Sequence, residues 1–230
     1  MPEEKYLRKI RSFVRREGRL TKGQQRALDE LFPVYGLAPA QGEVLNFQDI
    51  FGNDHPVHLE IGFGNGKTLT HMAANSADTN YIGIEVHRPG VGNALLQVEE
   101  QSLNNVRVIC EDAVEVINQH IPDQSLSAIY IFFPDPWHKK RHHKRRIIQT
   151  SFVEQLWQKL QANGILHYAT DWEDYAQHMM TVMQPVEGFT NLAGSGNFSE
   201  RPDYRPITKF EQRGLRLGHG VWDLIFKKVS

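Results

Sequence analysis

Four carboxylates follow or end four short apolar runs in the middle of the chain, and their spacing could hold one cationic ligand. They are Glu60, Glu85, Asp112 and Asp135. If the apolar runs form neighbouring parallel strands, the acids meet at the carboxyl edge of the sheet, where open α/β sheets bind ligands. At that edge Glu85 could accept both hydroxyls of a ribose, and Asp112 could accept an exocyclic amine. For Asp112 a helix N-cap is an alternative interpretation.

A glycine-rich turn, Gly62-Phe63-Gly64-Asn65-Gly66, follows the first of these runs. Glycines let the backbone bend tightly there and let a ligand approach the main chain. The dinucleotide fingerprint requires its third glycine three residues after the second, whereas Gly66 comes two residues after Gly64. A row of acids also repels a pyrophosphate. The pattern therefore favours S-adenosylmethionine, a cation with a ribose, an adenine and an ammonium group, over a nicotinamide dinucleotide.

The segment Phe132-Phe133-Pro134-Asp135-Pro136-Trp137 presents one of these acids rigidly. Its two prolines fix the backbone on either side of Asp135. Trp137 could stack on a base or pack against the sheet, and packing is the commoner fate of a tryptophan. Nine basic residues, 138–146, follow at once. A polyanion bound to them would lie within a few residues of Asp135, so methyl donor, acid and nucleic acid could meet at one site.

Charge is strongly segregated along the chain, although the formal net charge is only -1. Residues 1–30 have a net charge of +4, residues 138–146 of +6, and the remaining 191 residues of -11. An acidic body with two basic patches indicates a polyanion held at a defined place. A run of cations repels itself unless a partner neutralises it, which favours phosphate contact over a solvated loop for 138–146. For 1–30, a solvated helix and a polyanion contact are equally good interpretations.

Alternating strands and helices are expected to position these residues. Apolar runs predict strands at 57–61, 81–85, 106–110, 127–133, 164–170 and 221–226. The segments between them predict helices at 67–74, 93–101, 113–120, 147–161 and 172–183. This alternation predicts an α/β fold with a mostly parallel sheet and helices on both faces. The last strand is expected to be antiparallel and near an edge.

The other segments are expected to surround a single domain. Residues 1–32 are interpreted as a basic arm, in which Thr21 caps a short helix over 21–31 and order depends on a partner. Residues 33–56 are rich in proline and glycine and are interpreted as a wrap at the start of the domain 33–230. Within that domain, 138–146 and 194–220 are expected to be loop-like insertions.

Composition excludes several other classes of protein. A single cysteine, Cys110, rules out a disulfide framework. His138, His142 and His143 lie among cations, which disfavours metal capture, and no zinc-type spacing occurs, so no metal is expected. No run reaches the roughly 20 apolar residues of a membrane span. No secretory signal is expected either, and the cytoplasm is the simplest location.

Four blocks of the sequence resemble the bacterial tRNA (guanine-N7)-methyltransferases, a family of S-adenosylmethionine-dependent enzymes with the Rossmann-like class I fold. The blocks are Arg11–Arg16 (RSFVRR) with Gly18–Thr21 (GRLT), Leu59–Gly66 (LEIGFGNG), Phe133–Arg146 (FPDPWHKKRHHKRR) and Thr208–Gly214 (TKFEQRG). They occur in the expected order over nearly the whole chain. The resemblance implies methyl transfer to N7 of the guanine at position 46 in the variable loop of tRNA, with no obligatory protein partner.

The same resemblance implies roles for individual residues. The donor is bound by Glu60, Gly62, Gly64, Glu85, Asp112 and Asp135, and Asp135 is also the catalytic residue. The substrate is contacted by Lys139, Asp171, Thr208, Lys209, Phe210 and Glu211. RNA is contacted by Arg141, His142, His143, Lys144, Arg145 and Arg146. For Asp171 and Glu211 the alternative is that they form ion pairs with nearby arginines and so hold the segment 194–220.

Guanine N7 limits what Asp135 has to do, because this nitrogen carries a free lone pair and no proton. The transfer needs no general base, and Asp135 is expected to orient the guanine and to stabilise the positive charge that develops on the purine. Two other function classes fit the sequence less well. An RNA-binding module without activity would not need all four acids, and a nicotinamide-dependent oxidoreductase would need a different glycine spacing.

Overall fold

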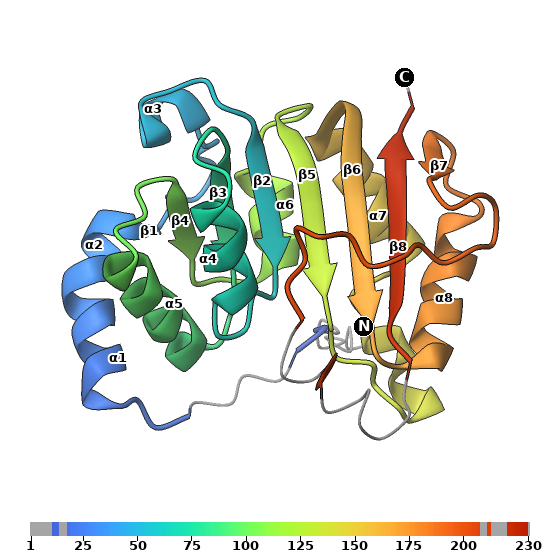
Figure 1. The fold of residues 1–230 in the computed structure, drawn as a ribbon, viewed down its shortest axis with the longest axis horizontal. Coiled ribbons are helices and arrows are strands. Elements are labelled where there is room, and N and C mark those ends of the chain that lie inside the picture. The colour runs from blue at the N-terminus through green and yellow to red at the C-terminus, as the bar shows by residue number, and fades with distance from the viewer. Residues whose placement is uncertain (1–10, 14–17, 208–210, 213–219, 230) are drawn as a thin grey trace, which may run out of the picture.

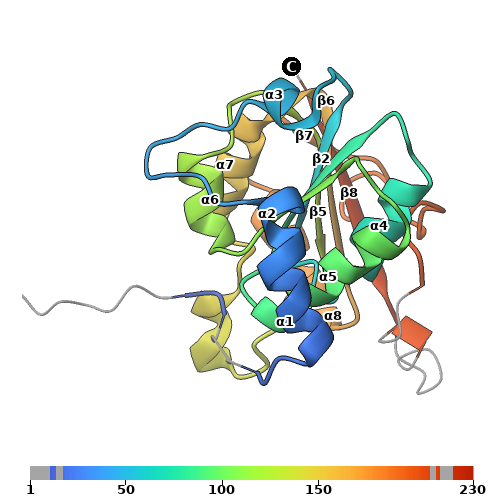
Figure 2. The same cartoon turned by 90° about the vertical axis from the view of Figure 1, so that its left-hand side faces the viewer.

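The computed structural model describes residues 11–13, 18–207, 211–212 and 220–229, and its centre is one sheet with helices on both faces (Figure 1, Figure 2). The described strands are β1 (Gly36–Leu37), β2 (Val57–Ile61), β3 (Asn80–Ile84), β4 (Val106–Ile109), β5 (Leu126–Phe132), β6 (Leu160–Thr170), β7 (Phe189–Asn191) and β8 (Trp222–Lys228). The α-helices are α1 (Lys22–Arg26), α2 (Phe32–Tyr35), α3 (Phe47–Phe51), α4 (Lys67–Ala74), α5 (Arg88–Glu100), α6 (Ala113–Gln119), α7 (Thr150–Lys159) and α8 (Glu173–Met183). A π-helical segment, η1 (Ala27–Leu31), joins α1 to α2, and a 3-10 helix, η2 (Lys140–Arg145), lies between β5 and α7.

The strands follow the order β1-β4-β3-β2-β5-β6-β8-β7 across the described sheet. The six strands β1-β4-β3-β2-β5-β6 pair parallel with one another, whereas β8 pairs antiparallel with β6 and with β7. This order confirms the expected Rossmann-like α/β fold and the antiparallel last strand. Because β2 lies between β3 and β5, the strands that carry the predicted acids are neighbours, and their carboxyl ends form one continuous edge.

Two hydrophobic cores, one on each face of the sheet, hold the helices in place. α4 and α5 bury Leu69 and Leu95 on one face, and α7 and α8 bury Leu156 and Met179 on the other. Each of these four side chains is 0% exposed. Full burial of a side chain of this size contributes about 1.5–3 kcal/mol. The cores therefore fix each strand in the sheet and, with it, the edge on which the functional residues lie.

The N-terminal helix extends beyond the segment that the sequence predicts. Thr21 caps it as expected, in a capping box in which the Thr21 N–H donates back to the side chain of Gln24. The helix then continues through η1 and α2. Ala27 and Leu31 are buried in the core formed with α5. The expected arm thus includes a helix packed on the domain, and the division of the chain at residue 32 stays a prediction.

Several boundaries differ from those that the sequence predicts. The expected wrap 33–56 contains helix α3 and the edge strand β1. The helix expected from residue 147 begins only at Thr150, and the strand expected from residue 164 begins already at Leu160. The described part of the segment 194–220 crosses the face of β5, β6 and β8 (Figure 1), and Ser199 forms an isolated bridge with Asp223 of β8. This segment therefore covers part of that face of the sheet.

Neither a membrane span nor a metal centre occurs in the described part of the chain. Each helix there is too short or too polar to cross a bilayer. The described His, Cys, Asp and Glu side chains form no group of three or more that could hold a metal ion.

Candidate active site

The carboxyl edge of the parallel strands brings together the four acids that the sequence singles out. Glu60 lies in β2, and the other acids follow β3, β4 and β5 within three residues of the strand ends. In the sheet these strands stand in the order β4-β3-β2-β5. The acids therefore form a row in the order Asp112, Glu85, Glu60 and Asp135. Their assignment to the methyl donor stays a prediction at this point.

Glu60 is the most deeply buried of the four acids, with 3% of its surface exposed. Its Oε2 atom meets no hydrogen-bond donor among the described residues. Burial, together with the negative charge of Glu85, raises the pKa of Glu60 to about 8. A buried carboxylate without a partner is costly, and a ligand that brings a donor to it removes that cost. Glu60 therefore marks this edge as a binding site for a cation or a hydrogen-bond donor.

Glu85 ties the glycine turn to the end of β3. Its Oε2 accepts a hydrogen bond from Gly64 N–H at 2.9 Å, and its Oε1 accepts from Val86 and His87 N–H at 2.7 and 2.9 Å. Gly62 and Gly64 have φ angles of +74° and +59°, which side-chain-bearing residues rarely adopt. A Cβ added at either glycine would meet no described atom within 4 Å. The space over the turn is thus open to a ligand.

Asp112 caps helix α6, as one of its two sequence interpretations predicts. Its Oδ1 accepts a hydrogen bond from Val114 N–H at 3.1 Å. The Asp112 side chain also lines a cavity of about 200 Å³, together with Arg11, Lys144 and residues of α7. The cap fixes the direction of the carboxylate, which keeps further acceptor capacity for a ligand. The two interpretations of Asp112 are therefore compatible.

The Pro134-Asp135-Pro136 corner is held in a strained backbone conformation. Phe133 before it and Trp137 after it have φ angles of +50° and +48°, in the left-handed region. For a residue with a side chain this conformation costs about 1–2 kcal/mol, and it persists only where surrounding contacts enforce it. Asp135 itself is exposed at the tip of the corner. The corner thus presents a carboxylate to solvent from a backbone that has little freedom.

Trp137 contacts the N-terminal segment, which is a different packing partner from the sheet that the sequence suggested. Its indole N–H donates to Ser12 O at 3.1 Å. The guanidinium of Arg145 lies 4.0 Å from the Trp137 ring centroid. The same guanidinium donates to the carbonyl oxygens of Arg11 and Phe13 at 3.1 and 3.2 Å. Segment 11–13 is therefore joined to the corner although the two are far apart in the sequence.

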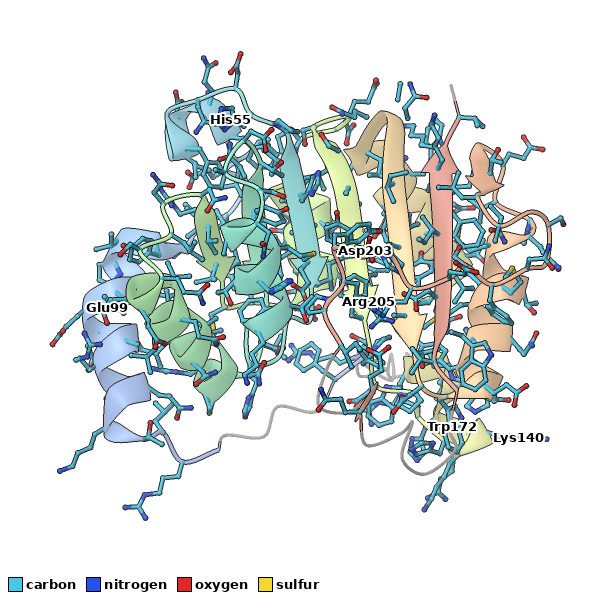
Figure 3. The ribbon with its side chains drawn as sticks, in the orientation of Figure 1. His55, Glu99, Lys140, Trp172, Asp203 and Arg205 are labelled. Atoms are coloured by element: carbon cyan, nitrogen blue, oxygen red, sulfur yellow. The ribbon has the colours of Figure 1, made fainter. Side chains whose placement is uncertain are left out.

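The basic run forms helix η2, and its cations point to different sides. Lys140, Arg141 and Lys144 are exposed. Lys140 and Trp172 both lie toward the carboxyl ends of the parallel strands (Figure 3). Arg146, by contrast, is only 2% exposed. The exposed cations form a surface that a polyanion can reach, beside the corner that carries Asp135.

The two histidines of the expected RNA-contacting set, His142 and His143, are half-buried in η2. Partial desolvation and the neighbouring cations lower the pKa of His142, so its ring is neutral at pH 7. The RNA contacts of 141–146 stay a prediction.

The expected substrate residues lie on different parts of the site. Lys139 directly precedes η2 and Asp171 directly follows β6, and both are exposed. Glu211 is 4% exposed, and its two carboxylate oxygens accept from Arg205 at 2.8 and 3.1 Å. Glu211 thus forms an ion pair of the kind that the alternative interpretation expects, and its contact with the substrate stays a prediction. The remaining three, Thr208, Lys209 and Phe210, lie outside the described residues.

Arg205 is the centre of a buried cluster that the sequence alone does not reveal (Figure 3). Besides Glu211, it donates to both carboxylate oxygens of Asp223 in β8, at 2.7 Å each. His167 Nε2 lies 2.7 Å from Asp223 Oδ1, and Tyr204 Oη lies 2.9 Å from His167 Nδ1. Although burial alone would raise the pKa of Asp223, its hydrogen bonds to His167 and Arg205 lower it. The available signal in the sequence was a histidine and an aspartate, each followed or preceded by large apolar residues of a strand.

Comparisons with known proteins agree with this geometry. A family profile described as "Putative methyltransferase" matches residues 54–224. The chain is 59% identical over 226 residues to a tRNA (guanine-N(7)-)-methyltransferase of Aeromonas hydrophila, covering 98% of this chain and 95% of that protein. It is 58% identical over 224 residues to the protein of the same name from Alcanivorax borkumensis, covering 97% and 93%. The crystal structure of the 16S rRNA methyltransferase KamB superposes with a TM-score of 0.61 at 12% identity, covering 84% of this chain and 100% of that chain, and this shows the fold alone.

Proposed function

Because this chain belongs to the tRNA (guanine-N7)-methyltransferase family, we propose that it transfers the methyl group of S-adenosylmethionine to N7 of a guanine in tRNA. The observation that carries the proposal is the 59% identity to a relative of that name over 98% of this chain. The position of the guanine, number 46 in the variable loop, is the part of the proposal that rests on the motif resemblance. A tRNA substrate is found in the cytoplasm, which we propose as the location, with no obligatory protein partner.

The carboxyl edge fits the methyl donor by the chemistry of its side chains. S-adenosylmethionine supplies, when bound, a methyl carbon that its sulfonium makes electrophilic. Glu60 Oε2, which has no hydrogen-bond partner among the described residues, suits the ammonium group of this ligand. Glu85 at the end of β3 suits the ribose hydroxyls, and Asp112 suits the adenine amine. The open space over Gly62 and Gly64 leaves room for the ligand beside the backbone.

Asp135 is proposed to act on the guanine by position and charge. N7 carries a lone pair and no proton, so no residue has to remove a proton before the methyl carbon is attacked. A fixed carboxylate can accept hydrogen bonds from the N1–H and amino group of guanine, and it stabilises the positive charge that moves onto the purine. Holding the reacting atoms about 3 Å apart supplies several kcal/mol of the barrier reduction. The rigid, exposed corner supports this role.

The basic surface beside the corner is proposed to bind the tRNA backbone. Lys139, Lys140, Arg141 and Lys144 are all exposed on or next to η2, and exposed cations of this kind contact phosphates without reading the sequence. Lys139 is four residues from Asp135, so we propose that it contacts the target nucleotide. Asp171 at the end of β6 is proposed to contact the substrate as well. The same role for 208–211 stays part of the proposal.

A product analysis tests the proposed function. Purified protein is incubated with bulk tRNA and methyl-labelled S-adenosylmethionine, and the tRNA is then digested to nucleosides. We expect the label in 7-methylguanosine, and a tRNA transcript with adenine at position 46 should accept no label. A different labelled nucleoside, or no label at all, would refute the function. Label that persists in 7-methylguanosine of the altered transcript would refute only the position.

A further inference from the structure

Arg146 points into the protein although it ends a run of basic residues. It is 2% exposed, whereas Lys140, Arg141 and Lys144 of the same run are exposed. A phosphate on the surface of the protein cannot reach a guanidinium that is buried to this degree. A buried cation is normally held by defined acceptors, so the contacts of Arg146 indicate what it does.

The guanidinium of Arg146 joins the catalytic corner to helix α8. Its Nε donates to Pro136 O at 2.9 Å, and its Nη2 donates to Asp174 Oδ2 at 2.5 Å. It also lies 4.7 Å from the ring centroid of Tyr175, the residue after Asp174. The hydrogen bond from Arg146 lowers the pKa of Asp174, so this carboxylate is ionised at neutral pH. The same Nη2 lies 3.2 Å from His143 Nε2 in η2. Arg146 thus connects a backbone carbonyl of the corner to side chains of α8 and η2.

The corner has few other points at which it can be held. Its two prolines have no N–H groups, so they donate no backbone hydrogen bond. At its start, Phe133 N–H donates to Ala169 O in β6 at 2.7 Å. At its end, Pro136 O accepts the hydrogen bond from Arg146. The left-handed conformations of Phe133 and Trp137 require such contacts, and Asp135 lies between the two fixed points.

We propose that Arg146 is a positioning residue for methyl transfer, which holds the Pro136 carbonyl against α8 and so sets the direction of the Asp135 carboxylate. The inference rests on the proposed function, because Asp135 has its catalytic role only in that reaction. In this proposal Arg146 does not make the RNA contact that the sequence resemblance implies, but holds the corner in place. Arginine suits this role because its planar guanidinium holds its N–H donors in a fixed geometry, whereas the ammonium of lysine is a compact charge on a flexible chain.

Asp174 distinguishes the two possible roles of Arg146. If Arg146 bound phosphate, removing the charge of Asp174 would release the guanidinium and would strengthen tRNA binding without slowing the reaction. If Arg146 supports the corner, the same change loosens the support and slows methyl transfer. Asp123 offers a matched control, because it also pairs an exposed carboxylate with a largely buried cation. The Asp123 side chain is 67% exposed and the Lys159 side chain 11% exposed, and Asp123 Oδ1 lies 2.6 Å from Lys159 Nζ. That pair lies beside the amino-terminal end of β5, whereas the site lies at the carboxyl ends of the parallel strands.

The experiment compares wild-type protein with Arg146→Lys, Arg146→Gln, Asp174→Asn and Asp123→Asn. Single-turnover methyl transfer is measured at saturating tRNA and donor, and tRNA affinity is measured at two salt concentrations. We expect both Arg146 variants to slow transfer by about tenfold or more, since misplaced reacting groups lose rate steeply. Their tRNA affinity should stay within about twofold and its salt dependence should not change, because Arg146 touches no phosphate. Asp174→Asn should slow transfer to a smaller extent, and Asp123→Asn should not.

Hydrogen exchange of the peptide 132–139 gives a second readout that does not depend on the reaction. We expect faster exchange in both Arg146 variants and no change in Asp123→Asn. If Arg146→Gln does not fold, Arg146→Lys and Asp174→Asn decide the outcome. The inference would be overturned if both Arg146 variants transferred the methyl group at the wild-type rate. It would also be overturned if their tRNA affinity depended less on salt while the transfer rate and the hydrogen exchange of 132–139 stayed unchanged. A wild-type protein that forms no 7-methylguanosine would refute the proposed function, while exchange would still test the support of the corner.

Discussion

Replacement of Glu60 by glutamine should stabilise the folded protein at neutral pH. Burial and the charge of Glu85 raise the pKa of Glu60 from 4.5 to about 8. A group whose pKa is raised on folding stabilises the folded protein at pH values below the pKa that the group has in the unfolded chain. This stabilisation is lost as the pH rises through the pKa that the group has in the folded protein. One pKa unit corresponds to about 1.4 kcal/mol. The wild-type protein should therefore lose about 3 kcal/mol relative to Glu60→Gln between pH 5 and pH 8.

Urea unfolding at pH 5, 6, 7 and 8 measures this difference. Other titrating groups are common to both proteins, so their contributions cancel when the free energy of unfolding of wild type is subtracted from that of the variant. The subtracted curve should rise with pH, whatever constant offset the new amide introduces. Glu154→Gln, at an exposed position of α7, serves as the control and should follow wild type. Parallel curves for wild type and Glu60→Gln would show that the carboxyl group is not held protonated, and the reasoning would fail.

The same substitution should weaken binding of the methyl donor. At pH 7 Glu60 is mostly protonated in the free protein, and a bound ammonium group favours its ionised form. Donor binding by wild type should therefore release a proton, close to one per site at pH 7, and binding by Glu60→Gln should not. The missing charged hydrogen bond should reduce affinity by about 10- to 100-fold. Calorimetry in buffers of different ionisation enthalpy measures both quantities, and equal proton release by the two proteins would contradict this role.

Three further variants test the other parts of the site. Asp135→Ala should abolish methyl transfer without changing the circular dichroism spectrum, because the side chain is exposed; a folded variant with full activity would refute its role. Glu85→Ala should weaken donor binding by about 1–3 kcal/mol, and unchanged affinity in calorimetry would contradict this. Alanine at Lys140, Arg141 and Lys144 together should weaken tRNA binding and reduce the salt slope by about 0.7–0.9 for each phosphate that is no longer neutralised, whereas donor affinity should not change; an unaltered slope would show that these cations bind no phosphate.

The central part of the fold could be predicted because its signals are local. Apolar runs that end in glycine or an acid, such as the one before Gly62, mark a buried strand and its carboxyl end without reference to other segments. Alternation with helices then places these ends on one edge. The row of acids that includes Glu85 and Asp112 follows from that rule, since both residues come within three positions of a strand end.

The parts that the sequence did not reveal depend on partners that are distant in the chain. Trp137 and Ser12 are 125 residues apart in sequence and hydrogen-bonded in the structure. The inward direction of Arg146 depends on Asp174 in another helix, 28 residues later. In the sequence, an inward and an outward arginine look the same, so the basic run predicts a charged surface but not which cations belong to it. The role of Arg205 could not be predicted for the same reason, because Asp223 lies in β8, 18 residues later.

The two edges of the sheet have a consequence for association between molecules. The edge strands of the described sheet are short, with two residues in β1 and three in β7. The long and largely buried strands β5 and β6, of seven and 11 residues, are enclosed between neighbours. Short edges leave few unpaired N–H and C=O groups as a template for another chain. The short edges therefore limit association of the protein through its sheet at high concentration, although its central strands are largely buried. A chain shortened past Leu37 would uncover β4 and gain a longer edge on which to aggregate.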